Sequence, residues 1–114
     1  MIKTQSRIQR GDIYLISLDP TVGSETKKTR PCVIVSNNLQ NSVSGRVIII
    51  PITSKLSQIY PFEVKIKVGN IEGKAMADQI RSIDKARLQK YLGIVNKSDL
   101  IKLEQAIKLV LNLE

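Results

Sequence analysis

Short apolar runs dominate the first two-thirds of the chain and predict β-strands. The runs are rich in β-branched residues and are separated by proline, glycine, asparagine and polar stretches. They are Ile13–Leu18, Cys32–Val35, Val47–Ile50 continuing through Pro51 to Ser54, Phe62–Lys67, Lys74–Ile80 and Tyr91–Val95. In the fourth run apolar and charged residues alternate, which is typical of a strand with one exposed face.

The end of the chain changes to a helical period. Ser98 is the expected N-cap, and Asp99 places a negative charge where the helix dipole favours it. The apolar residues that recur at spacings of three and four are Leu100, Leu103, Ile107, Val110 and Leu111. The pattern predicts an amphipathic helix whose apolar face packs against the rest of the protein.

Two polar segments between the predicted strands read as loops. Residues 21–30 carry Gly23, Ser24 and several basic residues, and residues 37–45 are mostly polar. The chain has 114 residues and no internal repeat or linker, so we expect one domain over residues 1–114. The expected fold is mainly β with helices: a compact, barrel-like β-domain closed by a C-terminal helix.

Charge and cysteine content narrow the function classes. The formal net charge is +8 and the sequence pI is about 9.8, so the protein is expected to attract polyanions such as nucleic acid. Cys32 is the only cysteine, which excludes an intramolecular disulfide and fits a reducing compartment. The N-terminus lacks the apolar stretch of a signal peptide, and no apolar run is long enough to cross a bilayer. We therefore expect a cytoplasmic protein without membrane contact.

The absence of histidine excludes several kinds of catalysis. A serine or cysteine nucleophile usually relies on a histidine base, and acid–base cleavage of RNA by paired histidines is equally ruled out. With one cysteine and no histidine, a zinc site has almost no ligands. Magnesium held by carboxylates alone stays conceivable, but the spacing of the acidic residues does not favour it. We expect no cofactor.

Three stretches together resemble the MazF/PemK/Kid toxins. Residues 10–38 read RGDIYLISLDPTVGSETKKTRPCVIVSNN, similar to the family's R-G-[DE] entry, first strand, G-S-E loop, and R-P before an apolar strand. Residues 51–55 read PITSK, where the family usually has a threonine or serine after an apolar strand. Residues 78–88 read DQIRSIDKARL, similar to the family's D/E-Q-[IV]-R-[ST]-[IVL]-D segment. Each stretch is weak alone, but the three occur in order at compatible spacing.

The resemblance implies an SH3-like β-barrel with a C-terminal helix that forms a homodimer. It implies the toxin of a type II toxin–antitoxin system, a sequence-specific endoribonuclease that cleaves single-stranded RNA and is inhibited by a short acidic, MazE-like antitoxin. The family analogy assigns the chemistry to Arg30 and Thr53. RNA carries its own nucleophile, the 2′-hydroxyl, so the protein need only align the phosphate and stabilise its growing negative charge. No metal ion is required for this reaction.

Further residues are expected to bind the RNA. In the family the loop before Arg30 borders the RNA channel, and here that loop carries Ser24, Glu25, Lys27 and Lys28. Asn37, Ser54 and Gln79 are additional candidates, and the carboxamides of Asn37 and Gln79 suit base edges because they both donate and accept hydrogen bonds. Aromatic side chains could stack on bases, but the chain has only three tyrosines and one phenylalanine, most of them expected in the core.

Three alternatives stay open at this point. A related barrel of the CcdB type binds gyrase and cuts no RNA, although the tail LVLNLE here lacks tryptophan. A passive SH3-like module would bind nucleic acid without cleaving it. An adaptor that docks through its terminal helix would do neither.

Overall fold

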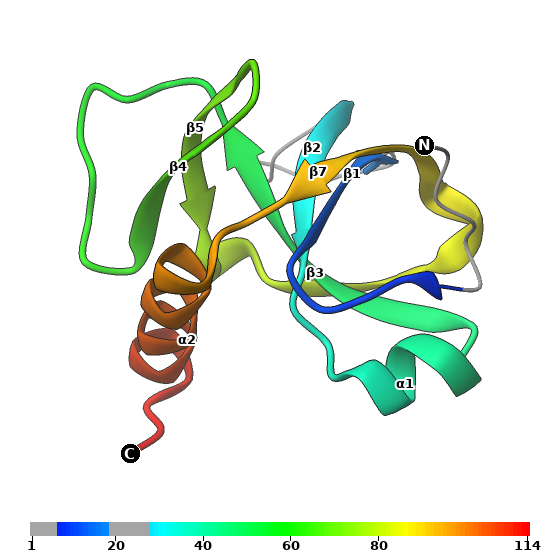
Figure 1. Cartoon of the computed structure of the whole chain (residues 1–114). Helices are drawn as coiled ribbons and strands as arrows, with labels where there is room; N and C mark the ends of the chain where they lie inside the picture. The colour runs from blue at the N-terminus through cyan, green and yellow to red at the C-terminus, as the bar shows by residue number, and fades with distance from the viewer. Residues whose placement is uncertain (1–6, 19–27) are drawn as a thin grey trace.

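The computed structural model describes residues 7–18 and 28–114, and these residues form an antiparallel β-sheet flanked by helices (Figure 1). In chain order the elements are β1 (Asp12–Ser17), β2 (Thr29–Ile34), α1 (Asn38–Val43), β3 (Arg46–Thr53), β4 (Glu63–Val68), β5 (Ile71–Met76), the 3-10 turn η2 (Ala77–Gln79), β6 (Arg81–Asp84), the 3-10 turn η3 (Lys85–Arg87), β7 (Leu88–Ile94) and α2 (Lys97–Leu111). The predicted mainly β fold with a C-terminal helix is confirmed.

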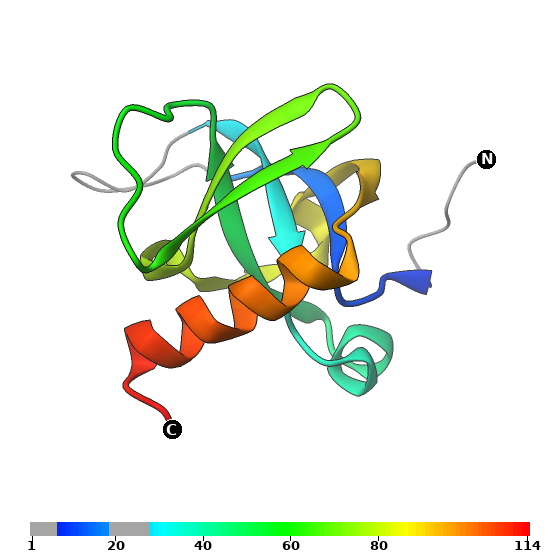
Figure 2. The same ribbon diagram turned by 60° about the vertical axis from the view of Figure 1, so that its left-hand side comes forward.

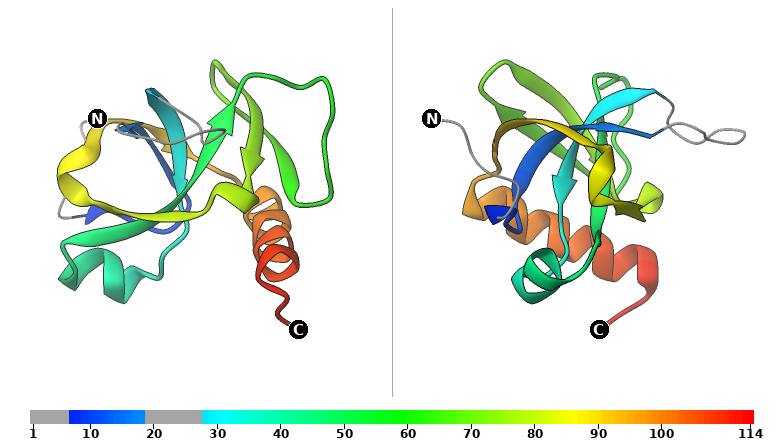
Figure 3. Two further views of the ribbon diagram at one scale, coloured as in Figure 1. Left: turned by 180° about the vertical axis from the view of Figure 1, so that it is seen from behind. Right: turned by 90° about the vertical axis from the view of Figure 1, so that its right-hand side faces the viewer.

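Strand β3 organises the sheet because it pairs with three other strands. The strand order is β4-β5-β3-β2-β1-β7, and β6 pairs with β3 beside this path. The first half of β3 pairs with β6, its middle pairs with β2, and its last two residues, Ile52 and Thr53, pair with β5. The sheet therefore splits around β3 into two parts that curl away from each other, as Figure 3 shows from two further sides.

The side chains on the two faces of the central strands belong to two separate hydrophobic cores. Along β3, Ile50 and Ile52 join the first core, whereas Val47 and Ile49 join the second. The first core lies between the sheet and α2 and includes Val33, Val64, Ile66, Leu103 and Ala106. The second core fills the curled half of the sheet and includes Ile16, Cys32, Ile34, Ile83 and Leu88. Both faces of β2 and β3 are thus buried, which explains why these strands read as continuous apolar runs.

Helix α2 lies across the strands of the first core (Figure 2). Leu103 and Ala106 are its buried residues, in agreement with the predicted amphipathic face. The helix begins earlier than predicted, because the N-cap is Asn96 and not Ser98. The Asn96 side chain accepts a hydrogen bond from the backbone N–H of Asp99 at 2.7 Å.

The prediction of a loop over residues 37–45 is wrong, because a short helix, α1, forms there. Asn37 is its N-cap: Asn37 Oδ1 accepts a hydrogen bond from the Gln40 N–H at 2.8 Å. Asn41 is buried and donates from Nδ2 to the Ser36 carbonyl at 2.9 Å. These side-chain hydrogen bonds stabilise a helix too short for hydrophobic periodicity to reveal.

The predicted strand over residues 74–80 is only partly correct. Strand β5 begins at Ile71 and ends at Met76, and Ala77–Gln79 form the turn η2. The turn moves the chain from β5 to β6, which then pairs with the first half of β3. Strand β6 was not predicted, since Arg81 and Asp84 interrupt its apolar pattern.

Among the described residues, no helix is long and apolar enough to cross a membrane.

Candidate active site

Arg30 and Thr53 lie on neighbouring strands at the same end of the sheet. The register of β2 and β3 pairs Val33 with Ile50 and Cys32 with Pro51. The paired residues end there, and the same register continued by two residues would set Arg30 opposite Thr53. Directly opposite side chains of antiparallel strands lie about 5 Å apart at Cβ. The two residues that the family analogy selected are therefore brought together.

The direction of both side chains follows from the two cores. Cys32 and Ile34 belong to the second core, so Arg30 is the next residue of β2 on that face. Along β3, Ile49 belongs to the second core, and Pro51 and Thr53 follow it on the same face at two-residue spacing. Arg30 and Thr53 thus extend the second core toward solvent, with a charged and a hydroxyl group where the apolar residues end.

The hydroxyl of Thr53 is held in place. Thr53 is 8% exposed, and its Oγ1 accepts a hydrogen bond from the backbone N–H of Lys55 at 3.3 Å. A hydroxyl has one proton to donate, and this contact does not use it. The Thr53 hydroxyl is therefore oriented and keeps its proton for a ligand oxygen.

Two further arginines gather around the end of β1, next to Arg30. Arg81 donates from Nη1 to the Leu18 carbonyl at 3.3 Å, and Arg87 donates from Nη1 to the Ser17 carbonyl at 3.1 Å. Arg30 itself pairs with Ile16, two residues earlier in β1. Two guanidinium groups therefore lie at the end of β1, and Arg30 lies beside it on β2; this set of arginines suits a phosphate.

The thiol of Cys32 lies within the electrostatic reach of this cluster. Burial raises the pKa of Cys32 to about 12, while the positive charges of Arg81 and Arg30 act in the opposite direction. Cys32 is fully buried and stays a neutral thiol at physiological pH. It is a core residue, as predicted, and both guanidinium groups lie near it.

A hollow of about 470 Å³ adjoins Arg30 between the start of β2, the end of β3 and the turn from β4 to β5. Lys28, Arg30 and Ser54, three of the predicted site residues, line it together with residues of that turn such as Asn70 and Glu72. Thr53 does not line this hollow, because it faces the opposite side of β3 from Ile52. Arg30 and Lys28 thus line the hollow, and Thr53 lies on the opposite face of β3.

The other predicted site residues are placed differently. Gln79 lies in η2, which contacts β3, and its Nε2 is 3.5 Å from Met76 Sδ. It therefore lies along the same edge of β3 as Arg81. Asn37 follows the far end of β2 and caps α1, so the structure does not bring it together with Arg30. Ser24, Glu25 and Lys27 lie outside the described residues.

Sequence reasoning missed Arg81 and Arg87 as members of the cluster. Both occur in the segment DQIRSIDKARL, but the sequence does not show that this segment returns to the end of β1. The available signal was the alternation of Arg81 with Ile83, which places Arg81 on the face of β6 that enters the second core.

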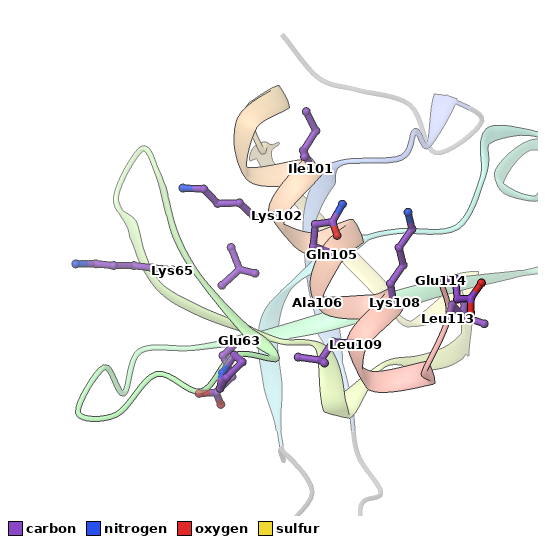
Figure 4. Close-up of a pocket in the computed structure, with 12 residues that line it drawn as sticks. Glu63, Lys65, Ile101, Lys102, Gln105, Ala106, Lys108, Leu109, Leu113 and Glu114 are labelled. Atoms are coloured by element: carbon purple, nitrogen blue, oxygen red, sulfur yellow. The ribbon is translucent and has the colours of Figure 1, made fainter.

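A larger groove of about 720 Å³ lies between α2 and β4, away from the arginine cluster (Figure 4). Leu109 points from α2 toward β4, whereas Lys65 points away from the helix. None of the predicted site residues lines this groove. In residues 7–18 and 28–114, no three His, Cys, Asp or Glu side chains are grouped as metal ligands would be.

Comparison with known proteins identifies the family of this chain. Residues 9–111 match the family model of PemK-like, MazF-like toxins of type II toxin–antitoxin systems. The chain is 37% identical to Endoribonuclease MazF9 of Mycobacterium tuberculosis, covering 93% of this chain and 98% of the relative. It is 34% identical to Endoribonuclease MazF of Staphylococcus epidermidis, covering 93% of this chain and 92% of the relative.

Solved structures show the same fold. MazF from Deinococcus radiodurans superposes with a TM-score of 0.84 at 26% identity, covering 93% of this chain and 97% of the other. An endoribonuclease from a mycobacterial species, solved in complex with its cognate antitoxin, superposes with a TM-score of 0.81 at 27% identity, covering 94% and 97%. The chain belongs to the PemK-like, MazF-like toxins of type II toxin–antitoxin systems, a family with endoribonuclease members.

Proposed function

We propose that this toxin is a metal-independent, sequence-specific endoribonuclease that cleaves single-stranded RNA, with Arg30 and Thr53 at the scissile phosphate. The observation that supports the proposal is the register of β2 and β3: continued two residues past its last pair, Cys32 with Pro51, it sets the backbone of Arg30 opposite that of Thr53 at one end of the sheet. The endoribonuclease relatives at 34% and 37% identity support the same activity.

The reaction uses groups that the RNA supplies. The 2′-oxygen loses its proton and bonds to the adjacent phosphorus, while the bond from phosphorus to the 5′-oxygen breaks and that oxygen gains a proton. The products are a 2′,3′-cyclic phosphate and a 5′-hydroxyl. Negative charge builds on the non-bridging oxygens, and a guanidinium, which stays charged and binds two oxygens at once, stabilises it. We assign this role to Arg30.

Thr53 contributes a directed hydrogen bond to the same phosphate. Its Oγ1 is already oriented by the Lys55 N–H, so little conformational freedom is lost when its proton turns to a phosphate oxygen. Lys28 and Ser54 line the adjoining hollow and suit contacts to neighbouring nucleotides. Gln79, on the other edge of β3, suits a base edge.

The partner of this toxin follows from its family and its charge. A mycobacterial relative has been solved with its cognate antitoxin. A short acidic antitoxin, MazE-like in character, would complement the net charge of +8 and compete with RNA for the arginine cluster. We further propose that residues 1–114 form one domain, that it assembles as a homodimer, and that it acts in the cytoplasm, where its RNA substrate is found.

Cleavage of RNA by the purified protein in EDTA tests the proposed function. We expect discrete fragments from a long RNA, mapped by primer extension, with 5′-hydroxyl ends and 2′,3′-cyclic phosphates, at a rate that EDTA leaves unchanged. Loss of cleavage in EDTA that magnesium restores would contradict metal independence. Binding without new 5′-hydroxyl ends would indicate a passive module, and inhibition of gyrase without cleavage would indicate the CcdB-like alternative.

The Thr53→Val substitution tests the role assigned to the hydroxyl. Valine keeps the shape of threonine but cannot donate, so we expect the single-turnover cleavage rate to fall at least about tenfold, the scale of a hydrogen bond to a charged group. Thr53→Ser keeps the hydroxyl and is expected to recover most of the activity. Equal rates for Thr53→Val and the wild type would remove Thr53 from the mechanism.

A further inference from the structure

The connection from β3 to β4 carries a stacked pair of aromatic rings at the protein surface. Residues 54–62 form the long green loop of Figure 1, which leaves the end of β3 directly after Thr53. Near its far end, the rings of Tyr60 and Phe62 are stacked, with centroids 5.4 Å apart and planes inclined by 1°. Tyr60 is 45% exposed, and Phe62 is partly buried behind it.

The other aromatic residues do not offer a comparable surface. Tyr14 is 2% exposed and meets Tyr91 edge-on, with ring centroids 5.5 Å apart and planes inclined by 69°. The chain contains three tyrosines and one phenylalanine, and all four are described. Tyr60 is therefore the most exposed aromatic ring of this protein, and it is backed by a parallel second ring.

Hydrogen bonds and an ion pair hold Tyr60 in position. Glu63 Oε1 accepts from the Tyr60 backbone N–H at 2.9 Å, and the Glu63 N–H donates to the Tyr60 carbonyl at 2.9 Å. Lys74 Nζ donates to the same Glu63 Oε1 at 2.9 Å, and it also donates to the Gln58 carbonyl. The Lys74 and Glu63 side chains are only 11% and 7% exposed, so this anchor is protected from solvent. A platform held in this way loses little conformational entropy when a ligand stacks on it.

The anchor connects the ring pair to the candidate active site. Lys74 is the cross-strand partner of Thr53 in the pairing of β3 with β5. Tyr60 is thus linked through the Glu63 side chain to Lys74, the residue opposite Thr53. If an RNA phosphate lies at Thr53, a nucleotide a few positions along the strand would meet Tyr60, and Lys55, which is exposed on the same loop, would accompany the RNA backbone.

We propose that Tyr60, backed by Phe62, is a stacking platform for one unpaired nucleobase of the bound RNA, a few nucleotides from the cleaved bond. This inference rests on the proposed endoribonuclease function. A base stacked on the outer face of Tyr60 would continue the parallel arrangement of the two rings, which is the favoured offset geometry for aromatic groups. The platform would hold the RNA strand in register and strengthen binding without reading a specific base edge.

Binding of an uncleavable RNA tests the platform. The probe is a fluorescent single-stranded RNA spanning the mapped cleavage site, with a 2′-deoxyribose at the scissile nucleotide, and the readout is Kd by anisotropy. We expect Tyr60→Ala and Tyr60→Leu to raise Kd about tenfold, the range of one base–aromatic stack, and Tyr60→Phe to bind like the wild type. Ile59→Ala is the matched control, because Ile59 is 44% exposed on the same loop but offers no ring. Thermal melting verifies that each variant is folded.

Abasic substitutions in the probe identify the stacked nucleotide. An abasic residue at that position is expected to weaken wild-type binding about as much as Tyr60→Ala does, with no further loss when the two are combined.

Wild-type affinity in Tyr60→Ala, or additive losses at every abasic position, would overturn the proposal. A Tyr60→Ala variant that loses affinity for the antitoxin but not for RNA would overturn it as well. If the wild type cleaves RNA and Tyr60→Ala binds normally, only the platform fails; if the wild type does not cleave, the proposed function fails.

Discussion

Arg30→Ala is expected to lower the single-turnover rate of RNA cleavage at least about a hundredfold. Removal of one preorganised donor to a developing oxyanion costs this much in other active sites, and here the donor also carries a full charge. Arg81 and Arg87 remain at the end of β1, so RNA binding is expected to weaken less than cleavage. The rate is measured with enzyme in excess over an end-labelled RNA, and Kd is measured on the uncleavable RNA.

Arg46→Ala is the matched control for this experiment. Arg46 begins β3 at the end opposite to Thr53, is exposed, and donates from Nε to Ser82 Oγ at 2.9 Å. Its removal changes the net charge as Arg30→Ala does but leaves the arginine cluster intact. We expect a cleavage rate within about twofold of the wild type, the scale of a surface substitution away from the site. Equal losses in the two variants would mean that Arg30 acts only through overall charge.

Gly73→Ala is expected to lower the free energy of unfolding by about 3 kcal/mol and to abolish cleavage. A Cβ at this position of β5 would lie 2.2 Å from the Thr53 carbonyl oxygen and 3.0 Å from the Thr53 carbonyl carbon. Both are backbone atoms of the paired strand, so no side-chain rotation can relieve the overlap. Either β3 separates from β5 or Thr53 shifts, and in both cases its hydroxyl leaves the position opposite Arg30. Urea unfolding followed by circular dichroism measures the loss of stability.

Gly45→Ala provides the control for backbone effects. No atom lies within 4 Å of a Cβ at Gly45, and its backbone does not require a positive φ. The same change of residue is therefore expected to alter the free energy of unfolding by less than about 0.5 kcal/mol. If Gly73→Ala proved as stable and as active as Gly45→Ala, the close approach of β5 to Thr53 would not exist in solution.

Local patterns predicted much of the fold because they reflect which faces are buried. The alternation over Phe62–Lys67 predicted β4, whose Val64 and Ile66 are buried in the first core. The three- and four-residue spacing after Ser98 predicted α2, whose Leu103 is fully buried. Helix α1 and strand β6 were missed because hydrogen bonds of Asn37 and Asn41 stabilise the first, and pairing with β3 stabilises the second. Neither interaction leaves a period in the sequence.

The sequence by itself determined the limits of the chemistry. It excluded histidine-dependent catalysis and an intramolecular disulfide, and it indicated a polyanionic partner through the net charge of +8; the resemblance of its ordered motifs to the toxin family implied roles for Arg30 and Thr53. These conclusions depend only on which residue types are present and in what order.

Only the tertiary structure decided which of these residues meet. The pairing of β2 with β3 brings the start of β2, with Arg30, to the end of β3, with Thr53, and hydrogen bonds from Arg81 and Arg87 hold these two side chains at the end of β1. Asn37 caps a helix at the other end of β2 instead. The register of paired strands, and the position of β6 and η3 beside the end of β1, depend on contacts between residues far apart in the sequence. No local pattern encodes such contacts. Pairing of β5 with β4 and β3 also places Lys74 and Glu63 where they can anchor Tyr60; the sequence offered Tyr60 only as one of four aromatic residues that could stack on bases, without showing which of them is exposed.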